Sequence, residues 1–320
     1  MSVLRQILKQ FVLFIFGWLL ASILIFGTIW LLPGDVAQII GGTTATPAEI
    51  AEIRTRLGLD QPLHVQYFKW IFDFLQGNLG TSLISGLSIA DQLAWRATIS
   101  LPLVAMAFLI TLLIAVPLGF WGGYRAGHTG ADVATASGFT IAAAPLVLIA
   151  LIIISVFSLR LGVFPAQGFN PTGWQDPLSA LRSLFLPALT IGIIEAAIVF
   201  RFVRSSVLDA VRSAPVLTGM SFGLTRMQAV LRFGMPQAGL NLLGVFGVQL
   251  ATMIVSSVVI ERLYALPGIG SMLVADIGGR DLPKVASVLL LITSFILVLG
   301  FIIDLAQKLI DPRLRTEVRK

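Results

Sequence analysis

Cysteine is absent from this chain of 320 residues, and charged residues are scarce, at 12%. Without cysteine the chain has no disulfide, no thiolate metal site and no cysteine nucleophile. The charged fraction is about half the roughly 25% of an ordinary soluble domain, while 57% of the residues are hydrophobic. Lipid rather than water is therefore the expected solvent for most of the chain.

Residue patterns typical of enzymes are also sparse. The two histidines, His64 and His128, are expected on opposite sides of the membrane, so they cannot share a site. The chain contains no H-E-x-x-H metal motif and no G-x-x-x-x-G-K-[ST] phosphate loop. We therefore expect passage rather than catalysis, with no cofactor and no metal bound by this chain.

Six apolar stretches are each long enough to cross a hydrocarbon core of about 30 Å as a helix of about 20 residues. They are Phe11–Leu32, Ala97–Tyr124, Val133–Leu159, Ser183–Phe200, Phe233–Ile260 and Val285–Ile303. Five contain no Asp, Glu, Lys or Arg, and the fourth contains only Glu195. Because unpaired backbone polar groups are costly in lipid, the expected fold class is an all-α integral membrane protein with about six transmembrane helices.

The first stretch resembles a secretory signal only superficially. It exceeds the apolar core of about 7 to 15 residues that signal peptides have, and it is followed by Pro33-Gly-Asp35 rather than a small-x-small cleavage site. We expect it to be retained as the first span.

Basic residues are distributed unevenly between the two sides of the membrane. With the N-terminus in the cytoplasm, the inner segments hold 13 Lys and Arg against 4 acids, a net charge of +9, and the outer segments have a net charge of −1. This asymmetry follows the positive-inside rule and places both termini in the cytoplasm. The pI near 10.2 therefore reflects topology, and we expect no nucleic-acid partner.

The outer segment Pro33–Arg96 is predicted to contain two short helices. Thr46 can cap the first, Pro47 suits its first turn and Gly58 suits its end. The second, Val65–Leu75, is rich in aromatic residues. Such residues fit either a position among the lipid headgroups or packing under the outer ends of the spans.

The inner loop Arg201–Arg232 is the most informative stretch, because it interleaves five arginines with apolar residues. Pro215 is predicted to begin a helix of about two turns, which Gly223 ends in a left-handed conformation. Some of its apolar side chains are expected to face water; the candidates are Val216, Leu217, Met220 and Phe222. An exposed apolar patch indicates a protein interface, and packing back on the bundle is the alternative.

A loop of this form before the second-last span resembles the coupling loop of binding-protein-dependent ABC importer permeases. The local match runs from Arg204-Ser-Ser-Val-Leu-Asp209 through Gly223-Leu224 to Arg232. Three positions depart from the family pattern: Asp209 stands where Glu is usual, Gly219 where Ala is usual, and Phe222 where Lys is common.

Further stretches, in order along the chain, are similar to the dipeptide and oligopeptide permease subunit that has a long outer segment. They are Leu57-Gly-Leu-Asp-Gln-Pro62, Gln76-Gly-Asn-Leu-Gly-Thr-Ser82, Pro117-Leu-Gly119, Phe164-Pro-Ala-Gln-Gly168, Leu186-Pro-Ala-Leu-Thr190, Val259-Ile-Glu261, Leu266-Pro-Gly-Ile-Gly270, Arg280-Asp281 and Asp311-Pro-Arg-Leu-Arg315. The ordered set covers nearly the whole chain.

The resemblance implies a type I ABC importer permease fold in the bacterial inner membrane. Residues 1–96 would form the added first span and outer segment, 97–310 the permease core with the coupling loop 201–232, and 311–320 a basic cytoplasmic tail. The implied partners are a second, different permease, two ABC ATPase subunits that bind ATP and Mg²⁺, and an extracytoplasmic solute-binding protein. This chain would then form half of a path for peptides or similar small solutes.

The resemblance also implies site residues. Those for ATPase coupling are Arg204, Asp209, Pro215, Val216, Leu217, Met220, Phe222 and Gly223, and those for the binding-protein face are Asp60, Gln61, Gly77 and Gly80. Glu195 is expected either to line the path or to pair with a nearby arginine such as Arg201 or with the second permease. A self-contained secondary transporter or channel is the alternative function, although the sequence shows none of the inverted repeats common in secondary transporters.

Overall fold

The computed structural model describes residues 3–31, 36–41 and 45–310, and the described residues are nearly all helical. The predicted basic tail, 311–320, lies outside them. The helices are α1 (Val3–Leu31), α2 (Val36–Gly41), α3 (Pro47–Leu57), α4 (Leu63–Leu75), α5 (Ile89–Tyr124), α6 (Thr129–Ala143), α7 (Leu146–Ile153), α8 (Pro177–Val211), α9 (Ala214–Ser221), α10 (Arg226–Ala229), α11 (Met235–Leu263), α12 (Ile269–Gly279) and α13 (Leu282–Ile310). Two π-helical segments, Ile154–Arg160 and Val230–Gly234, follow α7 and α10, and Gly173–Gln175 is a 3₁₀ turn.

Five helical stretches among the described residues are long and apolar enough to cross a membrane. They are Ile7–Ile29 within α1, α5, α8, Arg226–Leu263 and α13. A sixth span exists if the bent pair Thr129–Ala143 and Leu146–Arg160 is counted as one. The prediction of about six transmembrane helices in an all-α fold is therefore confirmed.

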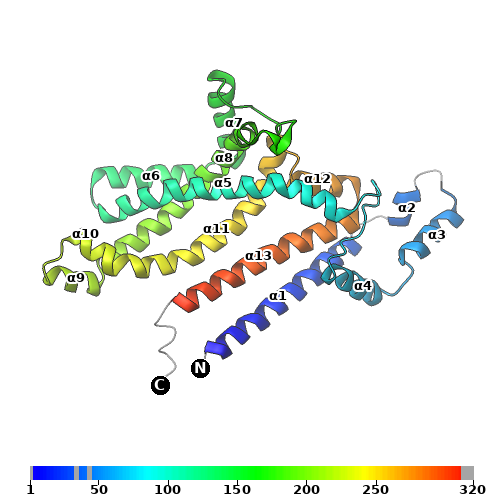
Figure 1. Ribbon diagram of the computed structural model, residues 1–320, viewed down its shortest axis with the longest axis horizontal. Coiled ribbons are helices and arrows are strands. Elements are labelled where there is room, and N and C mark those ends of the chain that lie inside the picture. Colours follow the sequence, from blue (N-terminus) through cyan, green and yellow to red (C-terminus); the bar gives the residue numbers. More distant parts are fainter. Residues whose placement is uncertain (1–2, 32–35, 42–44, 311–320) are drawn as a thin grey trace. The chain divides into compact units, whose positions relative to one another are not determined.

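The predicted third span, Val133–Leu159, is wrong as a continuous helix. The chain bends by 104° between α6 and the segment that begins at Leu146 (Figure 1). The break lies at Ala144, whose ψ of 139° is extended, directly before Pro145. A proline ring disfavours the helical conformation of the residue before it, and this explains the position of the bend.

Contacts divide the chain into two units. Among the described residues, the first consists of 3, 99–270 and 299–310, and the second of 4–31, 36–41, 45–98 and 271–298. In the first unit α8 is the central helix. About two thirds of the residues in its most apolar 18-residue stretch are buried, and it packs against α6, α7 and α11.

Small residues allow the helices of the first unit to approach closely. A Cβ added to Gly119 or Gly123 of α5 would lie 2.7 or 2.8 Å from the Cβ of Val203 or Val207 of α8, respectively. Close approach through glycine is a common way for helices to pack in membranes, where van der Waals contact replaces the hydrophobic effect between helices.

In the second unit, α1 contacts both α4 and the first half of α13. Trp18 donates a hydrogen bond to Ser294, with a distance of 2.7 Å between Nε1 and Oγ. The Tyr67 and Ser22 hydroxyls are 2.8 Å apart. The expected helix after Thr46 is confirmed, with Thr46 and Glu49 forming a capping box and Gly58 in the left-handed conformation.

Candidate functional site

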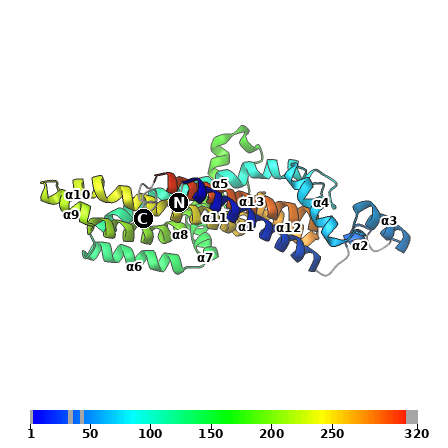
Figure 2. The same ribbon diagram turned by 90° about the horizontal axis from the view of Figure 1, so that it is seen from below.

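The loop between α8 and α11 forms the predicted short helix, α9, by local signals. Ser213 is extended and precedes α9, and Pro215 occupies the first turn. The helix begins at Ala214, one residue before the predicted start. Figures 1 and 2 show α9 and α10 together at one end of α8 and α11.

A left-handed glycine ends α9, as predicted. Gly223 has φ +90°, and its N–H donates to the carbonyl of Met220 at 3.0 Å. The N–H of Leu224 donates to the carbonyl of Gly219 at 3.2 Å. This pair of bonds is a Schellman motif, which fixes the direction in which the chain leaves the helix.

The two faces of α9 have different surroundings. Val216 is fully buried, and Gly219 packs against the ring of Phe233 and the methyl group of Ala229. Leu217, Met220 and Phe222 are 55%, 41% and 84% exposed. Val216 and Gly219 thus pack back on the loop, whereas Leu217 and Met220 of α9 and Phe222 directly after it expose large apolar side chains. That this exposed patch is a protein interface stays a prediction.

Gly219 allows α9 to pack closely on the second half of the loop, at Ala229 and Phe233. A Cβ at this position would lie 3.0 Å from two ring carbons of Phe233 and 3.4 Å from Cβ of Ala229. Contacts at 3.0 Å require the neighbour to shift. A glycine at 219, where the resembled family usually has alanine, therefore leaves room for the ring of Phe233 in this chain.

A cavity of about 290 Å³ lies beside the base of α9. Its lining residues are Ser206, Asp209, Ala210, Ser213, Pro215, Phe233, Gly234, Gln237, Ala238 and Asn241. Asp209 is exposed and is the only acidic or basic side chain among them. Arg204, one turn before the cavity, has a buried Nε with no hydrogen-bond partner among the described residues.

Arginines around the loop lie over aromatic rings. The guanidinium carbon of Arg226 is 5.0 Å from the ring centroid of Tyr124, and that of Arg232 is 5.7 Å from the ring centroid of Phe233. Cation–π contacts of this kind contribute about 0.5 to 1 kcal/mol at exposed sites. The contact of Arg226 attaches the loop to the end of α5, whereas Arg232 and Phe233 are neighbours in the sequence.

The loop also contains the letters G-x-S-x-G, from Gly219 to Gly223, which in α/β-hydrolases mark a nucleophilic serine. That motif requires a strand before the serine and a helix after it. Here Ser221 lies in the last turn of α9, and its hydroxyl donates to the carbonyl of Leu217 at 3.1 Å. The serine therefore has a structural explanation in a helix end.

Glu195 lies within the packed interior of the first unit. Its side chain is buried, and its Oε2 has no hydrogen-bond partner among the described residues. Arg201, the expected alternative partner, lies over the ring of Phe139, with its guanidinium carbon 5.5 Å from the centroid. Gly192 lies one turn before Glu195, and its carbonyl accepts a hydrogen bond from the hydroxyl of Thr111 at 3.1 Å. This bond joins α5 to α8.

A second buried carboxylate explains one of the recognised sequence stretches. Glu261 is fully buried and accepts a hydrogen bond from the hydroxyl of Ser100 at 2.6 Å, and the N–H of Ile269 donates to the same hydroxyl at 2.8 Å. A Cβ at Gly268 would overlap the Glu261 carboxylate. The glycine at 268 is thus required by a carboxylate seven residues earlier.

In the outer segment, the expected site residues lie in turns. Asp60 and Gln61 are exposed between α3 and α4, and the Gln61 carbonyl accepts from Nε2 of Gln66 at 2.7 Å. Gly77 and Gly80 have φ of +78° and +81°. A positive φ favours glycine, so these two positions have a backbone role independent of any partner.

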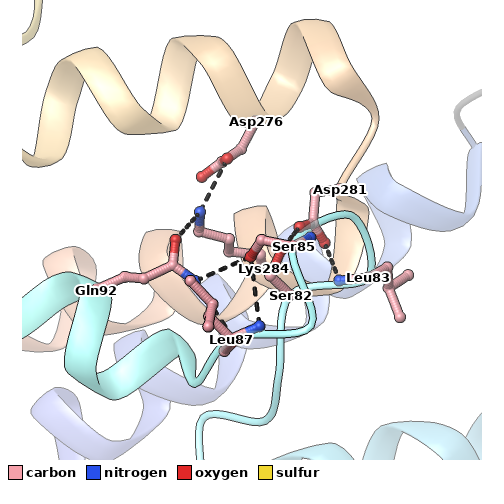
Figure 3. A network of polar contacts seen from close by, with 8 residues as sticks. All are labelled: Ser82, Leu83, Ser85, Leu87, Gln92, Asp276, Asp281 and Lys284. Atoms are coloured by element: carbon pink, nitrogen blue, oxygen red, sulfur yellow. Dashed lines mark hydrogen bonds and ion pairs between the residues drawn. The ribbon is translucent and has the colours of Figure 1, made fainter.

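Sequence reasoning missed a buried polar network in the second unit, drawn in Figure 3. Asp281 accepts from the Ser82 hydroxyl at 2.5 Å and from the Leu83 N–H at 3.2 Å. Lys284 lies 3.0 Å from Oδ1 of Asp276 and donates to Oε1 of Gln92 at 2.8 Å. The only available signals were the Arg280-Asp281 stretch and a lysine at the start of a span.

The network joins the short hairpin at Thr81–Ser88 to the segment around Asp281. Burial raises the pKa of Asp276, whereas the hydrogen bond and the charge of Lys284 act in the opposite direction. Asp281 is almost fully buried and holds both a side chain and a backbone N–H of the hairpin. These contacts order the end of the outer segment.

Comparison with protein families gives two matches that together span most of the chain. A model described as binding-protein-dependent transport system inner membrane component matches residues 115–316. A second, for the N-terminal part of such membrane components, matches residues 3–85. The residues between the two matches, 86–114, include the end of the hairpin and most of α5.

Individual relatives are similar over nearly their full length. The chain is 32% identical over 312 residues to a probable peptide ABC transporter permease protein of Sinorhizobium fredii, covering 97% of this chain and 98% of the relative. It is 30% identical over 316 residues to the glutathione transport system permease protein GsiC of Salmonella paratyphi A, covering 98% and 99%.

A solved structure shares the fold. The MetNI methionine ABC transporter, in inward-facing conformations, contains a chain that matches with a TM-score of 0.54 and 16% identity, covering 69% of this chain and 96% of that one. At this identity the likeness establishes the fold of the matched part and nothing about the solute.

Proposed function

The chain belongs to the family of binding-protein-dependent transport system inner membrane components, and from this membership we propose how its parts act in an ABC importer. It is a multi-pass membrane permease subunit of a peptide-type importer, not an enzyme. An ABC importer also contains an ATPase and a binding protein, so the surfaces of this chain must serve contacts with both.

We propose that the exposed face of α9 docks into a groove of the ATPase. The observation that supports this most is the set of exposed apolar side chains, Leu217 and Met220 on α9 and Phe222 directly after it, next to the buried Val216 that fixes the helix. A large apolar patch held rigidly at a loop is typical of a protein interface. The Schellman motif and the packing of Gly219 keep this face in one orientation.

The neighbouring site residues act in two ways in this proposal. Asp209, exposed beside the cavity, provides a charged contact for the same partner. Arg204, Pro215 and Gly223 shape the loop through the end of α8, the first turn of α9 and its last turn. Substitutions in the second group therefore act through the position of α9 rather than through lost contacts.

On the opposite side of the membrane, we propose that the outer segment faces the solute-binding protein. Asp60 and Gln61 are exposed in the turn before α4, and Gly77 and Gly80 form the turn that follows it. These turns are connected to the hairpin that Asp281 holds in place. A fixed platform at the mouth of the path suits delivery of a solute from a separate protein.

The path itself is proposed to form between this chain and a second, different permease, with two ATPase subunits that bind ATP and Mg²⁺. Peptides or similar small solutes are the proposed cargo, in line with the peptide and glutathione relatives. Glu195 is proposed to serve the path, because its buried Oε2 is free to accept a hydrogen bond. A self-contained secondary transporter is not favoured, since the relatives are permease subunits of transport systems.

The proposed orientation has both termini in the cytoplasm of a bacterium, with the chain in the inner membrane. In this orientation the loop 201–232 faces the ATPase and residues 33–96 face outward. Residues 1–96 then form the first span with the outer segment, 97–310 the permease core, and 311–320 the basic tail.

Docking by α9 is tested with Leu217→Asp and Phe222→Asp in the assembled importer. Burial of one such side chain at an interface is worth about 1.5 to 3 kcal/mol, and an unpaired buried carboxylate is strongly unfavourable. We expect each variant to insert in the membrane and pair with the second permease, but to lose most of its ATPase subunit on purification and most of its solute-stimulated ATP hydrolysis.

Val163→Asp is the matched control, because it places the same carboxylate on an exposed apolar position far along the chain from α9. It should leave ATPase co-purification normal. Normal co-purification and normal hydrolysis in both α9 variants would show that this helix is not the docking element.

A further inference from the structure

Helix α4 presents three different faces to its surroundings, and they cannot all be explained by packing within the chain. One face, with Tyr67, Trp70, Ile71 and Phe74, lies against α1 and α13. A second side exposes Phe68, Phe72 and Leu75 by 65%, 62% and 68%. These three are spaced i, i+4 and i+7, so they form one stripe along the helix.

A third flank of α4 is polar. Gln66, Lys69 and Asp73 are spaced i, i+3 and i+7, which places them on one line between the packed face and the apolar stripe. A helix in water would expose its polar side and bury its apolar sides. In α4 the polar flank covers only part of the surface, and Phe68, Phe72 and Leu75 form a second exposed stripe of large apolar side chains.

The contacts of the packed face give the depth of α4 along the first span. Tyr67 contacts Ser22 and Phe26 of α1, and the ring centroid of Trp70 is 5.9 Å from that of Phe26. The membrane-crossing part of α1 is Ile7–Ile29. At 1.5 Å per residue, Phe26 and Ser22 lie about 5 and 10 Å inside the end of that span. Trp18, whose ring centroid is 6.2 Å from that of Phe74, lies about 16 Å inside it.

We propose that α4 is an interfacial membrane helix that lies at the boundary of headgroups and acyl chains, with Phe68, Phe72 and Leu75 in lipid and the flank of Lys69 and Asp73 toward water. Interfacial helices bury their apolar face by about 5 to 10 Å at this boundary. The contacts of Tyr67 and Trp70 with α1 give this depth, and the contact of Phe74 with Trp18 places the C-terminal end of α4 deeper among the acyl chains. The surroundings of α1 indicate that lipid covers the stripe. Only 6% of the residues in the most apolar 18-residue stretch of α1 are buried within this chain, and α4 packs directly on α1. The apolar stripe thus continues the lipid-facing surface of the first span.

The absence of cysteine allows a direct test by site-directed spin labelling of the full-length chain in its assembled importer. Single cysteines are placed at Phe72 and Phe68 in the stripe and at Lys69 in the polar flank. Phe16→Cys, on an exposed position of α1, is the lipid reference, and Thr55→Cys, exposed on α3, is the water reference. The complex is reconstituted in liposomes of phosphatidylethanolamine and phosphatidylglycerol.

The measured quantity is the ratio of collision rates with oxygen, which concentrates in lipid, and with a water-soluble nickel chelate. We expect this ratio at Phe72 and Phe68 to be several-fold higher than at Lys69 and close to the value at Phe16, whether or not the solute-binding protein is added. Ratios at Phe72 and Phe68 equal to that at Thr55 would overturn the proposal. Labels that become inaccessible to both reagents only when the binding protein is added would also overturn it and would assign the stripe to that protein.

Discussion

Asp281 shows how a single side chain orders a segment that lies about 200 residues earlier in the sequence. Its carboxylate accepts from the hydroxyl of Ser82 and from the N–H of Leu83, and it is almost fully excluded from solvent. Hydrogen bonds to a charged group are worth about 1.5 to 3 kcal/mol each. Loss of this carboxylate would also leave the Ser82 hydroxyl buried without its acceptor.

We predict that Asp281→Ala loosens the hairpin Thr81–Ser88 while the distant α9 loop stays unchanged. Amide hydrogen exchange of residues 81–88 should accelerate by 10-fold or more, the equivalent of about 1.4 kcal/mol. Asp60→Ala, at an exposed position of the same segment, is the control. Equal exchange of the hairpin in Asp281→Ala and in the wild type would show that Asp281 does not hold it.

Residues of this kind lie beyond prediction from one sequence. The stretch with Arg280 and Asp281 supported a family resemblance, but no periodicity links Asp281 to Ser82 or Lys284 to Gln92. Their pairing depends on the tertiary fold. The end of α9, in contrast, was predictable at Gly223, because a left-handed helix end is encoded within a few residues.

At the scale of the element, hydropathy predicted which segments are apolar but not where they bend. The stretch 133–159 has the length of a span, yet the chain turns by 104° after Ala143. Pro145 was the only local signal, and proline by itself does not decide the outcome. Pro102 and Pro117 lie inside the continuous helix α5, since neighbouring helices in a membrane protein can compensate a lost backbone hydrogen bond.

The short helices follow the same division between local and tertiary information. The bounds of α3 and α9 were predicted to within one or two residues from their capping residues. Which side chains of α9 are buried could not be predicted, because Val216 and Gly219 pack against residues of the loop's second half. The exposure of Leu217 and Phe222 therefore emerges only from the structure.

At the scale of the whole molecule, the account depends on the orientation that the charge asymmetry predicts. We predict that a reporter active only in the cytoplasm is active when fused after Lys320 and silent when inserted near Thr44. The reason is the net charge of +9 in the segments assigned to the inner side and −1 in those assigned to the outer side. The reverse activity pattern would contradict the assignment of α9 to the ATPase side and of Asp60 to the binding-protein side.

The most direct test of the central claim is uptake by the importer reconstituted in liposomes with its second permease, its ATPases and its binding protein. A peptide mixture is supplied outside, and the accumulated species are identified by mass spectrometry. The account predicts accumulation that requires ATP on the ATPase side and persists when ionophores collapse all ion gradients. Accumulation by this chain without any ATPase, driven by an ion gradient and abolished by the ionophores, would contradict it.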